Sequence, residues 1–138
     1  AADFELEMEV RDYECDLQGI VNNAVYLSYL EHTRHCYLKT RGIDFAQLHD
    51  EGMDLVLVRV ELDYRAPLRS GDCFAVDLKL TRPSALRFAF EQQVLRLPQR
   101  QLVLRGYVVG TCLVQGRPSL PSFLLEKLGL PLRPEKKV

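Results

Sequence analysis

The sequence predicts a single α+β domain in which an antiparallel sheet of five to six strands wraps one long central helix. A strand with strictly alternating apolar residues comes first, and a long segment without Gly or Pro follows it. Four long strand-like segments then succeed one another, separated by short turn-rich stretches. The sheet and the helix can both bury their apolar surfaces if the sheet curls around the helix.

The first strand and the helix follow from local patterns. Residues 4–10, FELEMEV, alternate apolar and acidic side chains, which is the period of a strand with one face in water. The helix is expected from Asn23 to Arg41, with Asn22 as its N-cap and Gly42 as its stop. Its first half is apolar on nearly all sides, so we expect five of its residues to be wrapped by the sheet: Ala24, Val25, Leu27, Tyr29 and Leu30.

The remaining elements are read from alternation and turn residues. Residues 43–52 predict a short amphipathic helix or turn, and residues 119–129 a second short helix. Between them, four strands are expected in the stretches 55–65, 74–81, 86–97 and 101–114, and three successive hairpins connect them. In the first of these strands, one apolar face is shared by Val56, Val58, Val60, Leu62 and Tyr64. The predicted domain covers residues 1–130, and residues 131–138 are expected to form a flexible tail.

Composition excludes several classes of function. The 138 residues include 18 basic and 19 acidic ones, so the excess of positive charge typical of a nucleic-acid binder is missing. No apolar stretch has the length of a membrane span, and the acidic N-terminal residues are unlike a targeting peptide. The four cysteines (Cys15, Cys36, Cys73 and Cys112) are far apart and form no C-x-x-C pair, which indicates reduced thiols and a cytoplasmic protein.

The most informative motif combines an acid, a tight turn and the start of the helix. Asp16 stands three residues before Gly19, and Val21, Asn22 and Asn23 lead into the apolar helix. With this motif, VRDYECDLQGIVNNAVYLSYLEHTR (10–34) and VELDYRAPLRSGD (60–72) resemble the hotdog-fold acyl-CoA thioesterases related to 4-hydroxybenzoyl-CoA thioesterase. They are most similar to the branch of bacterial long-chain acyl-CoA hydrolases and plastid acyl-thioesterases. The chain departs from this family at position 20, which is Ile where many members carry His.

Thioester hydrolysis requires an attacking oxygen and positive polarisation of the carbonyl group. Asp16 is the candidate for the first role, either by attacking the carbonyl or by activating a water molecule. Gly19 permits the turn, and the free N–H groups at the start of a helix carry partial positive charge. The resemblance places the oxyanion contact at the backbone N–H of Asn23. Glu31, two turns further along the helix, is a further candidate for ordering water or the site.

The candidate substrate-binding residues surround this motif or carry positive charge at strand ends. They are Gly19, Val21, Asn22, Tyr26, Tyr64, Arg82 and Arg87. The two arginines are chosen because the resemblance implies that a nucleotide is held by a strand edge and loop there. The expected substrate is a fatty or aromatic acyl-CoA, or acyl-ACP, and no metal or dissociable cofactor is expected. His32 and His35 lie three residues apart but lack a third ligand.

The resemblance also implies an assembly, because the family builds each active site from two subunits. The open edges of a single curved sheet also favour association with another copy. We therefore expect a homodimer that pairs further into a homotetramer. Two other functions remain open for this fold: an acyl-thioester dehydratase or hydratase, and an acyl-CoA-binding module without turnover. A dehydratase would need a catalytic His opposite an acid, whereas the three histidines (32, 35 and 49) lie away from the Asp16 motif.

Overall fold

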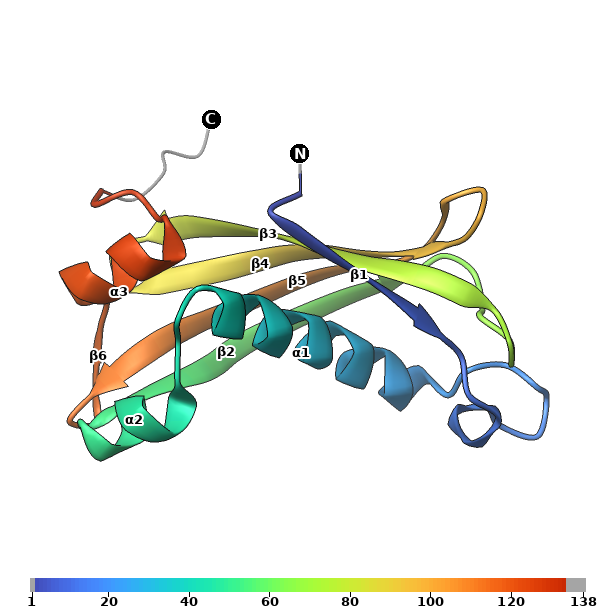
Figure 1. Cartoon of the computed structure of the whole chain (residues 1–138), viewed down its shortest axis with the longest axis horizontal. Coiled ribbons are helices and arrows are strands. Elements are labelled where there is room, and N and C mark those ends of the chain that lie inside the picture. The colour runs from blue at the N-terminus through green and yellow to red at the C-terminus, as the bar shows by residue number, and fades with distance from the viewer. Residues whose placement is uncertain (1, 134–138) are drawn as a thin grey trace.

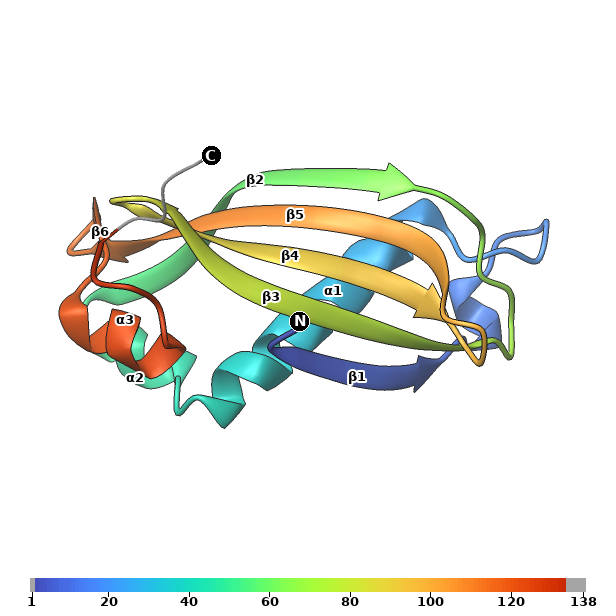
Figure 2. The same cartoon turned by 90° about the horizontal axis from the view of Figure 1, so that it is seen from above.

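A computed structural model describes residues 2–133. The elements are β1 (Phe4–Glu9), the 3-10 turn η1 (Asp12–Glu14), α1 (Asn23–Thr40), α2 (Phe45–Asp50), β2 (Met53–Tyr64), β3 (Cys73–Ser84), β4 (Arg87–Arg96), β5 (Gln101–Val114), β6 (Arg117–Ser119) and α3 (Ser122–Leu128). The strands form one antiparallel sheet in the order β1-β3-β4-β5-β2, and β6 pairs with β5. The sheet curls over α1 (Figures 1 and 2), which confirms the predicted hotdog arrangement.

One of the three predicted hairpins is wrong. β3–β4 and β4–β5 are hairpins, but β2 pairs with β5, and β3 lies between β1 and β4. The chain between β2 and β3 therefore crosses the end of the sheet (Figure 2). At its start, the N–H groups of Arg65 and Ala66 both donate to the Val103 carbonyl, so this segment stays attached to β5 after the strand ends. A connection of this length can reach across strands that are about 4.8 Å apart.

Helix α1 is buried on one side only. Its buried residues follow the three- and four-residue spacing of a single helical face: Tyr26, Tyr29, Leu30, Thr33, Arg34, Tyr37 and Leu38. Burial of Tyr29 and Leu30 is confirmed, and Val25 is half-buried. The predicted burial of Ala24 and Leu27 is wrong, because both side chains are exposed. The sheet of one chain covers one side of the helix, so the first turns remain open on the other side.

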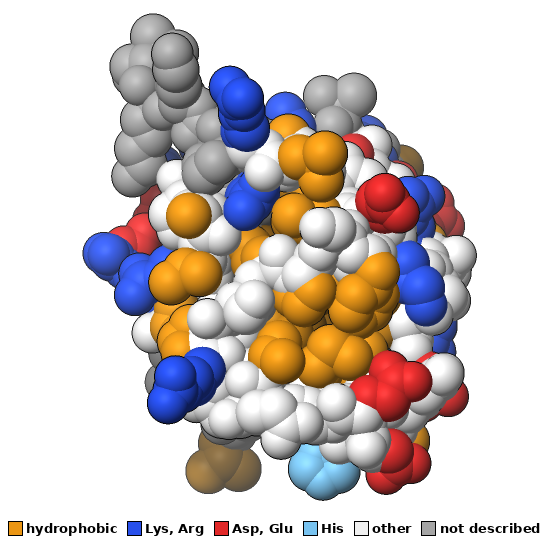
Figure 3. All heavy atoms as spheres, turned by 90° about the vertical axis from the view of Figure 1, so that its left-hand side faces the viewer, with side chains coloured by type: hydrophobic (Ala, Val, Ile, Leu, Met, Phe, Trp, Pro, Cys, Tyr) orange, Lys and Arg blue, Asp and Glu red, His pale blue; other side chains and the backbone are white. Residues whose placement is uncertain are grey.

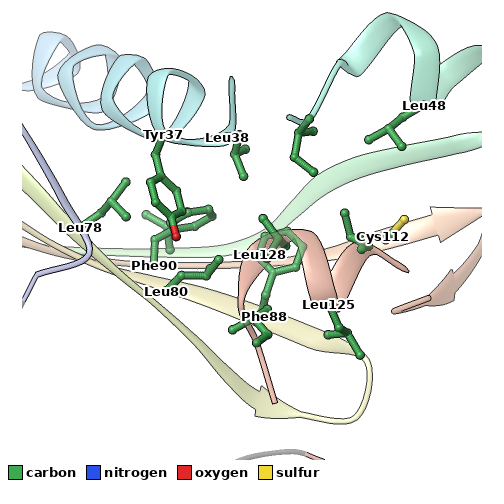
Figure 4. Close-up of a cluster of buried hydrophobic side chains, with 14 of the residues drawn as sticks. Tyr37, Leu38, Leu48, Leu78, Leu80, Phe88, Phe90, Cys112, Leu125 and Leu128 are labelled. Atoms are coloured by element: carbon green, nitrogen blue, oxygen red, sulfur yellow. The ribbon is translucent and has the colours of Figure 1, made fainter. Parts of the chain in front are cut away.

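The two halves of the core close differently. At one end of the sheet, α2 and α3 add Leu48, Leu125 and Leu128 to a cluster that includes Phe88 and Cys112 (Figure 4). At the other end, a second cluster lies beneath the first turns of α1 and includes aromatic and aliphatic side chains of β3, β4 and β5. Figure 3 views the α2–α3 end, where apolar side chains remain visible at the centre and charged side chains surround them.

The two edge strands of the sheet also differ. The outward-facing side chains of β1 are Glu5, Glu7 and Glu9, all exposed. On β2, by contrast, apolar side chains are left in solvent: Leu57 is 48%, Val58 45%, Val60 41% and Tyr64 47% exposed. The apolar face predicted for this strand is therefore only partly covered within one chain. Glu side chains oppose association along β1, whereas the apolar residues of β2 favour it.

The predicted C-terminal helix is confirmed in a shorter form, since β6 occupies the start of the predicted range and α3 follows it. Of the predicted tail, residues 134–138 lie outside the described residues. Within the described part, the Pro131 carbonyl accepts a hydrogen bond of 2.9 Å from Arg82 Nη1. The first residue of the predicted tail is therefore attached to the end of β3.

Candidate active site

The acid loop, residues 15–22, is a tight reversal of the chain. The Gly19 N–H donates to the Asp16 carbonyl (3.0 Å), and the Asp16 N–H donates to the Ile20 carbonyl (2.9 Å). Gly19 has a φ of 78°, in the left-handed region that a residue with a side chain adopts only under strain. The Val21 N–H donates to the Leu68 carbonyl (2.8 Å). This hydrogen bond joins the two segments that carry the family resemblance, 10–34 and 60–72. The predicted roles of Gly19 and Val21 as substrate contacts stay predictions, and their visible role is to shape the loop.

The Asp16 side chain is exposed and half engaged. Its Oδ1 accepts from the backbone N–H of Gln18 (2.8 Å) and, at 3.4 Å, from that of Ile20. Within residues 2–133, its Oδ2 accepts no hydrogen bond. The loop therefore fixes the carboxylate through one oxygen and leaves the other available for attack on a carbonyl group or for taking a proton from water.

The start of α1 presents one free donor. The Asn22 side-chain Oδ1 accepts from the Ala24 N–H (3.0 Å), and the Asn22 carbonyl accepts from the Val25 N–H (2.9 Å). The predicted N-cap is therefore confirmed. Among the described residues, no acceptor takes the Asn23 N–H. This N–H also lies at the positive end of the helix dipole, so it has the properties required of an oxyanion donor.

Two tyrosines border the helix start in different ways. Tyr26 is 2% exposed, and its hydroxyl accepts from the Leu68 N–H (3.0 Å), which ties the helix to the connection between β2 and β3. Burial raises the pKa of Tyr26, so it stays a neutral phenol. Tyr64 stacks edge-on against it and donates its hydroxyl to the Asn23 carbonyl (3.3 Å). Of the two predicted substrate contacts, Tyr64 is exposed within one chain and is therefore accessible to a substrate.

The remaining predicted residues are placed away from the acid loop. Glu31 is exposed on α1 and lines a groove of about 190 Å³ between α1, β2 and β4. Arg82 is 6% exposed and donates to the carbonyls of Ala85 and Pro131. Its guanidinium therefore joins the turn after β3 to the segment after α3. Arg87 is exposed at the start of β4. Arg82 lies near the end of β3 and Arg87 begins β4. That end of the two strands lies beside α3, opposite the acid loop (Figure 1). A single chain does not bring the two arginines to Asp16.

Residues 10–128, most of the chain, match the thioesterase-like superfamily. The chain belongs to this superfamily. It is 39% identical over 102 residues to the chloroplastic acyl-acyl carrier protein thioesterase ATL3 of Arabidopsis thaliana, a match that covers 74% of this chain and 54% of that protein. It thus spans about half the length of the first curated relatives it matches. It is also 26% identical over 125 residues to the long-chain acyl-CoA thioesterase FadM of Escherichia coli, covering 88% and 94% of the two chains.

Solved structures of superfamily members have the same fold. A thioesterase of Thermus thermophilus complexed with coenzyme A and Zn superimposes with a TM-score of 0.79 at 28% identity, over 93% of this chain and 98% of that one. A 1,4-dihydroxy-2-naphthoyl-CoA thioesterase from Synechocystis gives a TM-score of 0.84 at 23% identity, over 91% and 95% of the two chains. The predicted family and fold are therefore confirmed.

Other predicted features of this superfamily member can be checked against the described residues. In residues 2–133 no three His, Cys, Asp or Glu side chains gather as metal ligands. His32 contacts the Cys36 thiol, with Nε2 3.6 Å from Sγ, and His35 packs on the Phe45 ring. No helix in this range has both the length and the apolar character needed to cross a membrane. Independence from metal stays a prediction.

Sequence analysis missed one buried polar pair. Arg34 and Gln92 are 7% and 1% exposed, and Arg34 Nη1 donates to Gln92 Oε1 (3.1 Å). A signal for Arg34 was present, because it falls on the same helical face as Tyr26, Leu30 and Tyr37. A charged residue at such a position needs a buried partner or a function. The partner lies on β4, and only the fold brings the two residues together.

Proposed function

We propose that the chain hydrolyses an acyl-CoA or acyl-ACP thioester to a free acid and a thiol. The observation that carries this proposal is that one short loop and the helix start after it hold a carboxylate oxygen and a backbone N–H for which residues 2–133 supply no partner. The names of the relatives support the same reaction class, since those relatives are thioesterases of acyl-acyl carrier protein and of acyl-CoA. The acyl group is fatty or aromatic.

The proposed reaction assigns one role to each of the predicted catalytic groups. The thioester carbonyl oxygen accepts the Asn23 N–H, and the helix dipole stabilises the negative charge that develops on it. Asp16 Oδ2 either attacks the carbonyl carbon, giving an anhydride that water then hydrolyses, or takes a proton from the water that attacks. In both routes the C–S bond breaks as the carbonyl reforms, and the thiolate leaves. Glu31 helps to order water along the open face of α1.

The proposed assembly is a homodimer formed through the β2 edge, with pairing of dimers into a homotetramer. The exposed apolar side chains of β2 and the open first turns of α1 lie on this side of the chain. If two β2 strands pair antiparallel around a two-fold axis, the α3 end of one copy approaches the acid loop of the other. Arg87 of a second copy would then supply positive charge for the phosphates of coenzyme A. Arg82, whose guanidinium is already engaged, would shape that end of the sheet.

Light scattering at micromolar protein concentration tests the assembly. We expect a mass of at least twice 15.9 kDa. A substitution of Val60 by Asp would place a charge on the exposed face of β2 and should shift the mass towards the monomer. Glu7→Asp on the other edge is the matched control and should leave the mass unchanged. A monomer for the unaltered protein would contradict this assembly.

The reaction is proposed to need no metal or dissociable cofactor, because a carboxylate and a helix N-terminus together supply both the nucleophile and the oxyanion donor. Turnover should survive prolonged dialysis against a strong chelator. Activity that is lost on dialysis and restored by zinc or magnesium would contradict this part of the proposal. A cytoplasmic location is proposed on the four free cysteines.

A panel of acyl-CoA substrates tests the function itself. Purified protein is incubated with fatty and aromatic acyl-CoAs and a thiol reagent, and release of free coenzyme A is expected for at least one member. Binding of acyl-CoA without thiol release would favour the binding module. Addition or removal of water across an acyl double bond, detected from the ultraviolet absorbance of the enoyl thioester, would favour the dehydratase or hydratase.

A further inference from the structure

Arg34 is a largely buried cation, and the carboxylate that acts on its charge, Glu31 one helical turn earlier, forms no ion pair with it. Among residues 2–133 no carboxylate oxygen lies within 4.0 Å of it, and only its Nη1 donates a hydrogen bond, to the neutral amide of Gln92. Its remaining N–H groups, on Nε and Nη2, donate to no acceptor in this range. Neither atom is among the fully buried polar atoms that lack a partner in this range, so water in the adjacent groove reaches them. An oxygen atom of a ligand in the groove can replace that water.

The guanidinium is held in a defined orientation. Gln92 Nε2 donates to the Leu30 carbonyl (3.2 Å), which fixes the amide whose oxygen receives Arg34. The Arg34 side chain also lies over the Phe90 ring, 6.0 Å from its centroid. A charged group that is locked by neighbours in this way can recognise a ligand without first losing conformational entropy.

Arg34 is one wall of the groove of about 190 Å³ that Glu31 also lines. The rest of the lining is largely apolar, including Phe88 and Phe90 of β4 and Leu57 of β2. A volume of this size holds about six water molecules, or the end of an acyl chain of comparable volume. The groove thus combines an apolar wall with one oriented donor, as binding sites for small organic groups commonly do.

The groove lies downstream of the proposed oxyanion donor on the same helix. Arg34 is about 16 Å beyond Asn23 along the helix axis. The exposed Leu27 and Glu31 lie between the two positions, on the side of α1 that the sheet leaves open. An extended acyl chain of about twelve carbons, with C–C bonds of about 1.5 Å, spans this distance. A chain that starts at the Asn23 N–H and follows α1 therefore ends in the groove.

We propose that Arg34 is a specificity residue that selects acyl groups with a neutral oxygen, a hydroxyl or carbonyl, near the end remote from the thioester. This inference rests on the proposed function. The free N–H groups of Arg34 donate to that oxygen. Glu31 lines the same groove with the opposite charge, so the groove as a whole favours a neutral polar group over a carboxylate. An unsubstituted chain leaves the donors unpaired and binds less well.

Three substrates of equal length test the inference: dodecanoyl-CoA, ω-hydroxydodecanoyl-CoA and the monothioester of dodecanedioic acid. For the unaltered protein, kcat/KM should be at least about tenfold higher for the hydroxylated chain than for the plain chain, the scale of one well-placed hydrogen bond. Arg34→Met should reduce that ratio to about one, and Arg34→Lys should restore part of it. Lys39→Met, an exposed change on the same helix, is the matched control and should keep the ratio.

Three results would overturn the inference: no preference for the hydroxylated chain in the unaltered protein, a ratio that Arg34→Met leaves intact, or a preference for the carboxylated chain above both others. If Arg34→Met does not fold, the preference of the unaltered protein and the effect of Arg34→Lys still decide. Calorimetry with non-hydrolysable thioether analogues of the three substrates gives a separate readout. It measures the preference of the groove even if no thioester is hydrolysed, so failure of the proposed function and failure of this inference can be told apart.

Discussion

At the end of the molecule formed by α2 and α3, side chains such as Leu48, Leu124 and Leu128 close the core, whereas at the end formed by the acid loop Asp16 and Asn23 are exposed. The first end resembles the interior of any small domain. The second keeps a carboxylate oxygen and a helix-terminal donor without partners among residues 2–133. Stability and the chemical step, measured as kcat at saturating substrate, should therefore depend on different ends, and substitutions at each end should separate them.

The largest expected effect is on turnover at the open end. Asp16→Asn removes the charge and the basicity but keeps the Oδ1 acceptor for the Gln18 N–H. We expect kcat to fall by at least about a hundredfold, with an unchanged melting temperature. Asp12→Asn is the matched control, because it is another exposed acid of this end that accepts a hydrogen bond. Near-normal turnover of a folded Asp16→Asn protein would remove Asp16 from the mechanism and direct attention to Glu31.

At the end formed by α2 and α3, a substitution should lower stability without changing turnover. Leu124 of α3 is fully buried, and Leu124→Ala should lower the free energy of unfolding by about 2–5 kcal/mol. Turnover per folded molecule should stay the same. Denaturant titration measures the first quantity, and a thiol-release assay at low temperature measures the second. Leu132→Ala, at a side chain that is 67% exposed, is the control and should change neither. A large loss of kcat in the folded Leu124→Ala protein would contradict the separation.

Asn22 should affect both quantities, because it caps the helix that carries the oxyanion donor. Asn22→Ala removes the acceptor of the Ala24 N–H and should cost about 1 kcal/mol of stability. We also expect a lower kcat, since fraying of the first turn displaces the Asn23 N–H. Asn22→Asp retains a capping oxygen and should keep stability. Thermal denaturation and steady-state kinetics on the three proteins check this, and an unchanged kcat in Asn22→Ala would place the oxyanion site elsewhere.

The smallest effect is expected at Asp77, which belongs to neither end. Burial raises the pKa of this carboxyl above 3.8, even though its Oδ1 accepts from the Gln93 N–H (2.7 Å). The folded protein therefore binds the Asp77 proton more tightly than the unfolded chain does. The free energy of unfolding falls as pH rises from the pKa of Asp77 in the unfolded chain to its pKa in the folded protein.

Asp77→Asn should for this reason raise the melting temperature slightly at neutral pH, and the gain should disappear as pH is lowered to about 4. Glu91→Gln, at an exposed position of the neighbouring strand, is the matched control. Thermal denaturation across the pH range measures both. A gain for Asp77→Asn that persists unchanged at low pH would exclude the titration of this carboxyl as its cause.

Much of the fold was predictable because it depends on local patterns. The alternation in FELEMEV, the cap at Asn22 and the turn at Gly19 each involve residues close in sequence, and all three are confirmed. The identity of the family also came from two contiguous segments, 10–34 around Asp16 and 60–72. The roles of Asp16, Asn23 and Glu31 stay predictions, although Asp16 lies in the acid loop and Asn23 begins the helix that follows it.

The tertiary structure decided what depends on distant segments. The pairing of β2 with β5, rather than β3, is determined by a connection that crosses the end of the sheet. The open side of α1 depends on how far one sheet reaches around a helix. The contact of Arg34 with Gln92 joins residues on α1 and β4. The sequence by itself determined the elements and the chemistry of the acid loop, because capping, turns and alternation act between neighbours. Only the folded chain decided which edges stay open and which charges stay unpaired, because those depend on which distant surfaces meet.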